Sequence, residues 1–146
     1  ADLLNKDWGI DAGVWCVTSF SELRREAEEI ERWNLLHPDE KAQKSHLENK
    51  LKNYRVPTVA VSDYVKMVSE QIAPYIQGPY YALGTDGFGR SETRENLRHF
   101  FEIDRFYIVL AGIRALALLG KIEKEKMQEA VKKYGIDPEK PSPITV

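Results

Sequence analysis

The sequence has one cysteine, no long uninterrupted apolar segment and almost no net charge. The single Cys16 excludes a disulfide within the chain and suits a reducing compartment, so we expect a cytoplasmic protein. The formal charge of −2 disfavours nucleic acid or an anionic membrane as a partner, since both attract concentrated positive charge. The most apolar segment, Phe106–Gly120, is too short to span a membrane and contains Arg114, so it predicts a buried helix.

Residue patterns that hold metals or perform catalysis are also missing. The three histidines lie far apart, with no second metal-ligand type at a usual spacing, which disfavours a zinc site. Cys16 lies in an apolar run, and we expect it to be a small buried side chain rather than a nucleophile. The carboxylates stand where helix caps belong, at Asp63, Asp86, Glu95 and Asp104. The residues alone therefore define no catalytic, cofactor-binding or metal-binding side chain.

The length of 146 residues suits one domain, residues 1–146, in which strands and helices alternate. Short β-branched and aromatic runs predict strands at 14–20, 56–63 and 80–84. Apolar residues at helical spacing predict helices at 21–33, 64–76, 92–101, 104–119 and 123–134. Residues 39–54 fit either a helix or a loop, and residues 136–146 form an extended, proline-rich tail. This order predicts an α/β fold of three layers, with a mostly parallel sheet flanked by helices.

The first residues predict a helix that is cut short. Leu3, Leu4 and Trp8 share one helix face, and Gly9 suits the C-terminal cap. The chain has no initiating methionine, and there is room for only two turns before Gly9. We therefore expect a fragment of a longer multidomain chain, in which the first strand and the start of this helix are missing.

The stretch GTDGFGRSETRENLR, residues 84–98, combines glycines, an aspartate and arginines ahead of a helix. Its spacing fits neither the P-loop nor the dinucleotide fingerprint. Glu92 and Glu95 occupy the first turn of the helix, where they would repel a phosphate. We expect a strand-to-helix turn with Ser91 as the N-cap. The alternative is a stand-alone module that binds a small molecule or phosphate in the glycine loop.

Five collinear pieces of the sequence resemble the C-terminal region of the homodimeric bacterial pyruvate dehydrogenase, a thiamine-diphosphate-dependent oxidoreductase. The resemblance spans essentially the whole chain, and its most specific piece is the block around the glycine stretch. The pieces are Val17–Phe20, Glu31–Asn34 with His37-Pro38, Ser62–Tyr64, Leu83–Asp104 and Tyr134–Lys140. The resemblance implies a domain similar to the C-terminal domain of transketolase.

The resemblance also implies a division of labour within a longer enzyme. The parent decarboxylates pyruvate oxidatively and acetylates the lipoyl group of its acetyltransferase partner, while thiamine diphosphate and magnesium bind between upstream domains across the dimer. The family's diphosphate motif is Gly-Asp-Gly with a distant asparagine; Thr85-Asp86-Gly87 lacks the first glycine, and Asn96 follows too closely. No catalytic or cofactor residue therefore transfers to this chain, and we expect the fragment to bind no cofactor and to be inactive.

Such a domain is expected to support the dimer and to border the approach to the active site. The glycine stretch combines high polar density with one aromatic side chain, a composition found at contact surfaces. We expect it to meet the second subunit or an upstream domain, with Phe88 as the anchor. The candidate interface residues are Asp86, Phe88, Arg90, Arg94 and Arg98.

Overall fold

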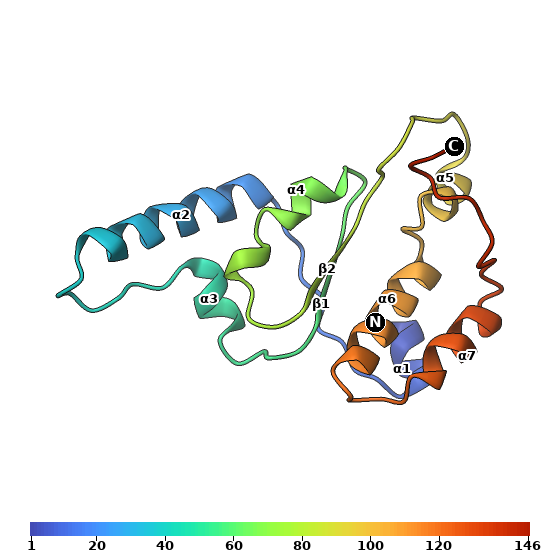
Figure 1. Cartoon of the computed structure of the whole chain (residues 1–146), viewed down its shortest axis with the longest axis horizontal. Helices are drawn as coiled ribbons and strands as arrows, with labels where there is room; N and C mark the ends of the chain where they lie inside the picture. The colour runs from blue at the N-terminus through green and yellow to red at the C-terminus, as the bar shows by residue number, and fades with distance from the viewer.

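Two short parallel strands run through the middle of the molecule, which the computed structural model describes over all of residues 1–146 (Figure 1). Strand β1 spans Thr58–Val61 and strand β2 spans Tyr80–Leu83. Thr58 pairs with Tyr80 at one end of the ladder, and Val61 pairs with Leu83 at the other. The predicted parallel pairing is confirmed, although the sheet has two strands rather than three.

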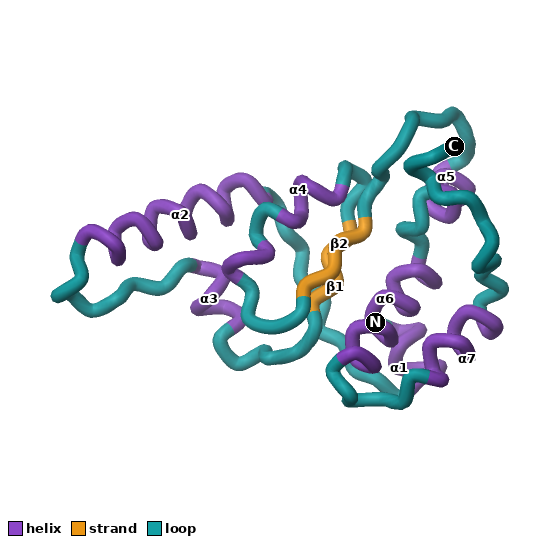
Figure 2. The backbone as a smooth tube through the Cα atoms, viewed as in Figure 1, coloured by secondary structure: helices purple, strands orange, loops and turns teal.

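Helices lie on both sides of these strands, as the α/β prediction requires (Figure 2). Helix α4 contacts both strands from one side, and helix α6 contacts both from the other. Helices α2 and α3 continue the α4 side, and α1 and α7 pack beside α6. The bounds are α1 Asp2–Trp8, α2 Phe20–Leu36, α3 His46–Leu51, α4 Lys66–Glu70, α5 Arg94–Phe100, α6 Arg105–Leu118 and α7 Glu125–Lys133, with a 3₁₀ turn at Ala73–Tyr75.

The main apolar core forms where α1, α6 and α7 meet. Val109, Ile113 and Ala130 are buried at its centre, and side chains of α1 pack against them. Trp8 Nε1 donates a hydrogen bond to the Tyr134 hydroxyl at 2.7 Å, which joins α1 to the end of α7. The short first helix is therefore held by tertiary contacts, since a helix of seven residues has little stability of its own.

Several predicted helix ends are confirmed. Gly9 ends α1 in the left-handed conformation, with φ of 64°. Asp104 caps α6, because its Oδ1 accepts the backbone N–H groups of Phe106 and Tyr107 at 2.8 and 3.1 Å. The apolar segment predicted to be buried is this α6, and no helix of the structure is long and apolar enough to cross a membrane. The residues left open between 39 and 54 contain α3, which begins with a capping box of Ser45 and Glu48.

The predicted first strand, residues 14–20, is wrong. Residues 14–19 have no regular structure, and Val14 and Trp15 are 80% and 55% exposed. Cys16 is exposed as well, so the expectation of a buried thiol is also wrong. Strand preference reflects packing on a sheet surface, and this segment has no strand beside it in the chain.

Two predicted helix starts are shifted. The helix expected from residue 64 begins at Lys66, because Ser62 Oγ accepts the N–H of Tyr64 in a local turn instead of capping a helix. It ends at Glu70, since Pro74 lacks the N–H that would bond to the Glu70 carbonyl. The N-cap of α5 is Thr93 and not Ser91.

Candidate interface site at the glycine loop

The loop of residues 84–91, here called the glycine loop, connects β2 to α5 at the carboxyl end of the sheet. Gly84 is buried, and a Cβ built on it would lie 2.6 Å from the backbone N of Lys66 and 2.9 Å from the carbonyl carbon of Val65. The Thr85 N–H donates to the Tyr64 carbonyl at 2.9 Å. The base of the loop is therefore fixed against the backbone that follows β1, at a distance that only glycine permits.

Asp86 binds the beginning of α4 from within the loop. Its Oδ2 accepts the backbone N–H of Lys66, the first residue of α4, at 3.2 Å. The N-cap residue of α4, Val65, has no side chain that can accept a hydrogen bond, so Asp86 supplies this acceptor from 20 residues further along the chain. The carboxylate also complements the partial positive charge of the helix end.

Three apolar side chains remain exposed around this fixed base. Phe88 in the loop is 75% exposed, and Tyr64 and Met67, beyond the end of β1, are 70% and 72% exposed. The carboxyl ends of parallel strands lie at the same edge of a sheet, so these residues share one end of the molecule. We call Tyr64, Met67 and Phe88 the carboxyl-edge patch.

The three candidate arginines have different environments. The Arg90 guanidinium lies over the Phe100 ring, 4.4 Å from its centroid. Arg98 pairs with Asp63 at 3.2 Å, with both side chains largely exposed. Arg94 is exposed and forms no ion pair within the chain. Two of the arginines thus brace the loop and α5, and all three are positioned at the carboxyl edge.

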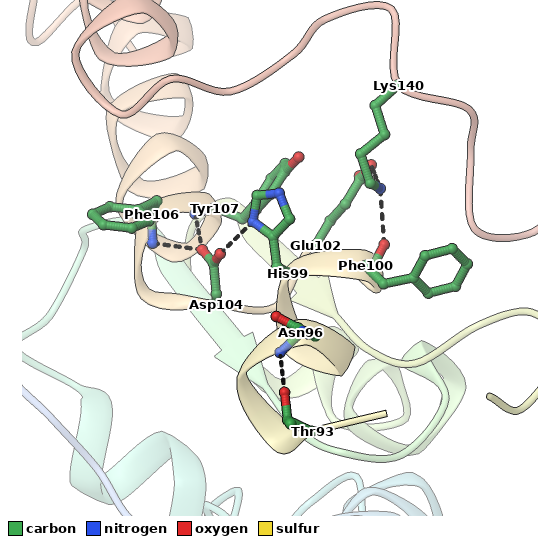
Figure 3. A network of polar contacts seen from close by, with 9 residues as sticks. All are labelled: Thr93, Asn96, His99, Phe100, Glu102, Asp104, Phe106, Tyr107 and Lys140. Carbon is green, nitrogen blue, oxygen red and sulfur yellow. Dashed lines mark hydrogen bonds and ion pairs between the residues drawn. The ribbon is translucent and has the colours of Figure 1, made fainter. Parts of the chain in front are cut away.

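A polar network joins α5 to α6, as Figure 3 shows. Thr93 Oγ1 accepts the N–H of Asn96 at 3.3 Å, and His99 Nδ1 lies 2.9 Å from Asp104 Oδ2. Burial, together with the negative charges of Glu102, Asp104 and Asp137, raises the pKa of Tyr107 to about 12. A phenol with this pKa stays protonated near neutral pH, which makes Tyr107 a poor general base.

The residues of this chain do not fit thiamine diphosphate and its magnesium ion. Asp86, the only aspartate of the partial motif, is bound to the N–H of Lys66, and Asn96 lies inside α5. No group of three or more His, Cys, Asp or Glu side chains is placed to hold a metal ion. The carboxylate of Asp86 at the start of α4 and that of Glu95 in the first turn of α5 also oppose a phosphate at either helix end.

The sequence locates the glycine loop and Phe88 but not the other two residues of the carboxyl-edge patch, Tyr64 and Met67. The predicted helix 64–76 includes Tyr64, because its spacing to Val68 and Ile72 is helical. The helix starts later, so Tyr64 stays outside it. The available signal was Ser62, whose hydroxyl favours a local turn over the first turn of a helix.

The family comparison defines the class of this protein. The model of the transketolase-like C-terminal domain matches residues 1–104. The chain therefore belongs to the transketolase-like C-terminal domain family, in agreement with its helices and small parallel sheet.

The chain is also similar to individual curated proteins, each named "Pyruvate dehydrogenase E1 component". It is 53% identical to the protein from Cupriavidus necator over 146 residues, all of this chain and 16% of that protein. The protein from Pseudomonas aeruginosa is 51% identical over 145 residues, 99% of this chain, and that from Escherichia coli K12 is 44% identical over 144 residues, 98% of this chain. The chain spans 16% of the length of each of these relatives. The resemblance to the C-terminal region of bacterial pyruvate dehydrogenase is thereby confirmed.

Proposed function

We propose that this chain is the C-terminal domain of a pyruvate dehydrogenase. The parent enzyme decarboxylates pyruvate oxidatively and transfers the acetyl group to the lipoyl group of an acetyltransferase partner in the cytoplasm. The support is the similarity over 98–100% of this chain to relatives named as the E1 component of that enzyme. Pyruvate chemistry belongs to the whole parent, of which this chain corresponds to a small part.

In this proposal, the domain itself takes no part in the chemical reaction of the parent enzyme. Thiamine diphosphate and magnesium bind to upstream domains of the parent. This part of the proposal is supported by the poor match between the residues of this chain and the cofactor. Asp86 is hydrogen-bonded to the start of α4, and the chain presents no cluster of metal-ligating side chains. The isolated chain is accordingly inactive and does not bind the cofactor.

The domain's role in the parent is to support the homodimer through the glycine loop. The observation that carries this role is the 75% exposure of Phe88 on a loop whose base is fixed by Gly84, Thr85 and Asp86. An aromatic side chain on a rigid support loses little conformational entropy when a partner covers it. Tyr64 and Met67 are further exposed apolar side chains at the same edge of the sheet, as expected of a surface that a neighbouring subunit or upstream domain covers.

The arginines complete the proposed interface, and Asp86 contributes to it by fixing the loop that carries Phe88. Arg94 has no ion-pair partner within the chain and is available to a carboxylate of the neighbour. Arg98 already pairs with Asp63, yet its side chain is 43% exposed and can bind a second carboxylate. Arg90 lies over Phe100 and is exposed, so its N–H groups can donate to a group of the neighbour.

Replacement of Phe88 by alanine in the full-length protein tests this role. We expect the dimer dissociation constant to rise by about thirtyfold, since truncation of an interface aromatic typically costs about 2 kcal/mol. Sedimentation velocity across a concentration series measures the constant. Pyruvate-dependent activity, assayed at a protein concentration near that constant, should fall in parallel.

The matched control is Leu35→Ala, because Leu35 is 78% exposed but lies at the end of α2, away from the carboxyl edge. Its dimerisation and activity should match those of the unmodified protein. If Phe88→Ala leaves both quantities unchanged as well, the glycine loop is not part of the interface.

A further inference from the structure

The C-terminal tail runs back along α5 and reaches the glycine loop (Figure 1). A Cβ built on Gly87 would collide with the carbonyl oxygen of Pro143 and lie 2.9 Å from its carbonyl carbon. Gly87 has φ of 120°, and Pro143 is buried although it lies only three residues from the last residue of the chain. The loop backbone therefore packs directly on the tail backbone, an approach that a side chain at position 87 would prevent.

A second contact anchors the tail at Lys140, three residues before Pro143. Lys140 Nζ donates to the carbonyl oxygen of Phe100 at 2.8 Å and to Glu102 Oε1 at 2.9 Å (Figure 3). The Lys140 side chain is only 17% exposed, which makes it the least exposed of the three lysines that form ion pairs in the chain. The ammonium also lies 5.4 Å from the centroid of the Phe100 ring.

The tail then closes a hollow between the sheet and α6. Ser142, Pro143 and Ile144 form one wall of this hollow, which has a volume of about 340 Å³ and includes Asp86 and Lys66 in its lining. The tail, Asp86 and the first residue of α4 thus line the same hollow. Gly87, next to Asp86, is the residue that the tail presses on.

We propose that residues 140–144 act as a strap that fixes the conformation of the glycine loop. The strap is anchored by Lys140 and presses on Gly87 through Pro143. Because Asp86 caps α4, the strap also holds the cap and the position of Tyr64 and Met67. Its consequence for dimerisation rests on the proposed function, whereas its effect on the loop does not.

Deletion of residues 140–146 from the full-length protein tests the strap. We expect the amides of Thr85 and Lys66 to exchange with solvent at least about tenfold faster, because their hydrogen bonds lie at the base of the loop and at the Asp86 cap. The amide of Tyr134, bonded to the Ala130 carbonyl at 3.0 Å in the core of α6 and α7, should keep its rate. Unchanged exchange at Thr85 and Lys66 would overturn the proposal.

A pair of glycine variants isolates the contact without deleting any chain. Gly87→Ala should speed exchange at Lys66 and Thr85, whereas Gly89→Ala should not, since a Cβ at Gly89 meets no atom within 4 Å. In the protein lacking residues 140–146, Gly87→Ala should have a smaller effect, because only the strain of its φ is left. Equal effects of Gly87→Ala with and without the tail would contradict the strap.

Dimerisation of the same variants separates the strap from the proposed interface. Faster loop exchange together with a weaker dimer supports both proposals. Faster loop exchange with an unchanged dimer keeps the strap and rejects the loop as an interface. If the deletion also speeds exchange at Tyr134, it destabilises the whole domain. The glycine variants then test the strap: faster exchange in Gly87→Ala than in Gly89→Ala supports it, and equal rates in the two variants reject it.

Discussion

At the scale of single residues, the two adjacent tyrosines of β2 face opposite layers. The Tyr80 hydroxyl donates to the Ser69 carbonyl, at the α4 side of the sheet, at 2.6 Å. The Tyr81 ring faces α6, where the Arg114 guanidinium lies 5.4 Å from its centroid. The alternation of side chains along a strand predicts this arrangement, and the structure confirms it.

The buried phenol of Tyr80 makes stability sensitive to alkaline pH. Burial raises its pKa to about 12, although the hydrogen bond with Ser69 acts in the opposite direction. The folded-state pKa exceeds that of the unfolded chain, so the stabilisation is complete below about pH 10 and is lost as the pH rises toward 12. Because Tyr80 is only partly buried, solvent screening limits the loss in the free energy of unfolding to at most about 2 kcal/mol.

Urea unfolding of the unmodified protein and of Tyr80→Phe, from pH 8 upward, measures this effect. Near neutral pH the variant should be less stable by about 1 kcal/mol, since it lacks the hydrogen bond. The difference should shrink and then reverse as the pH passes 10, because phenylalanine does not ionise. Tyr64→Phe, at a 70% exposed position, is the control, and a Tyr80→Phe difference that stays constant with pH would contradict the assignment.

At the scale of secondary-structure elements, caps decide where the short helices begin. Thr93 Oγ1 accepts the N–H of Asn96 at 3.3 Å, whereas Ser91 makes no such bond. We expect Thr93→Ala to lower the free energy of unfolding by about 1 kcal/mol and Ser91→Ala to change it by less than about 0.5 kcal/mol. Thermal or urea unfolding of the two variants compares them directly. A larger loss for Ser91→Ala would restore the N-cap that the sequence suggested.

The sequence predicts those elements whose signals are local. β2, the Gly9 end of α1 and the Asp104 start of α6 each depend on a few neighbouring residues, and all three are confirmed. The predicted strand at 14–20 fails because a strand needs a partner, which local preference does not supply. Local signals are also insufficient for the site. The glycine spacing locates the loop, but two of its contacts involve segments that are distant in the sequence. These are the hydrogen bond of Asp86 to the N–H of Lys66 and the packing of Pro143 on Gly87.

At the scale of the whole molecule, the distribution of apolar side chains favours a part of a larger assembly. Only 14 of the 146 residues are buried, although a chain of this length can bury a large core. Exposed large apolar side chains occur at the carboxyl edge, along residues 14–17 and at several helix ends and loops. This pattern fits the proposed role, in which neighbouring domains and a second subunit cover these surfaces.

We propose that the whole domain supports an enzyme whose cofactor binds to other domains. Calorimetric titration of thiamine diphosphate with magnesium tests it most directly, with the isolated 146-residue chain in one experiment and the full-length protein in the other. We expect saturable heat from the full-length protein and none from the isolated chain, whose Asp86 is committed to the cap of α4. Saturable, tight binding by the isolated chain would contradict the account.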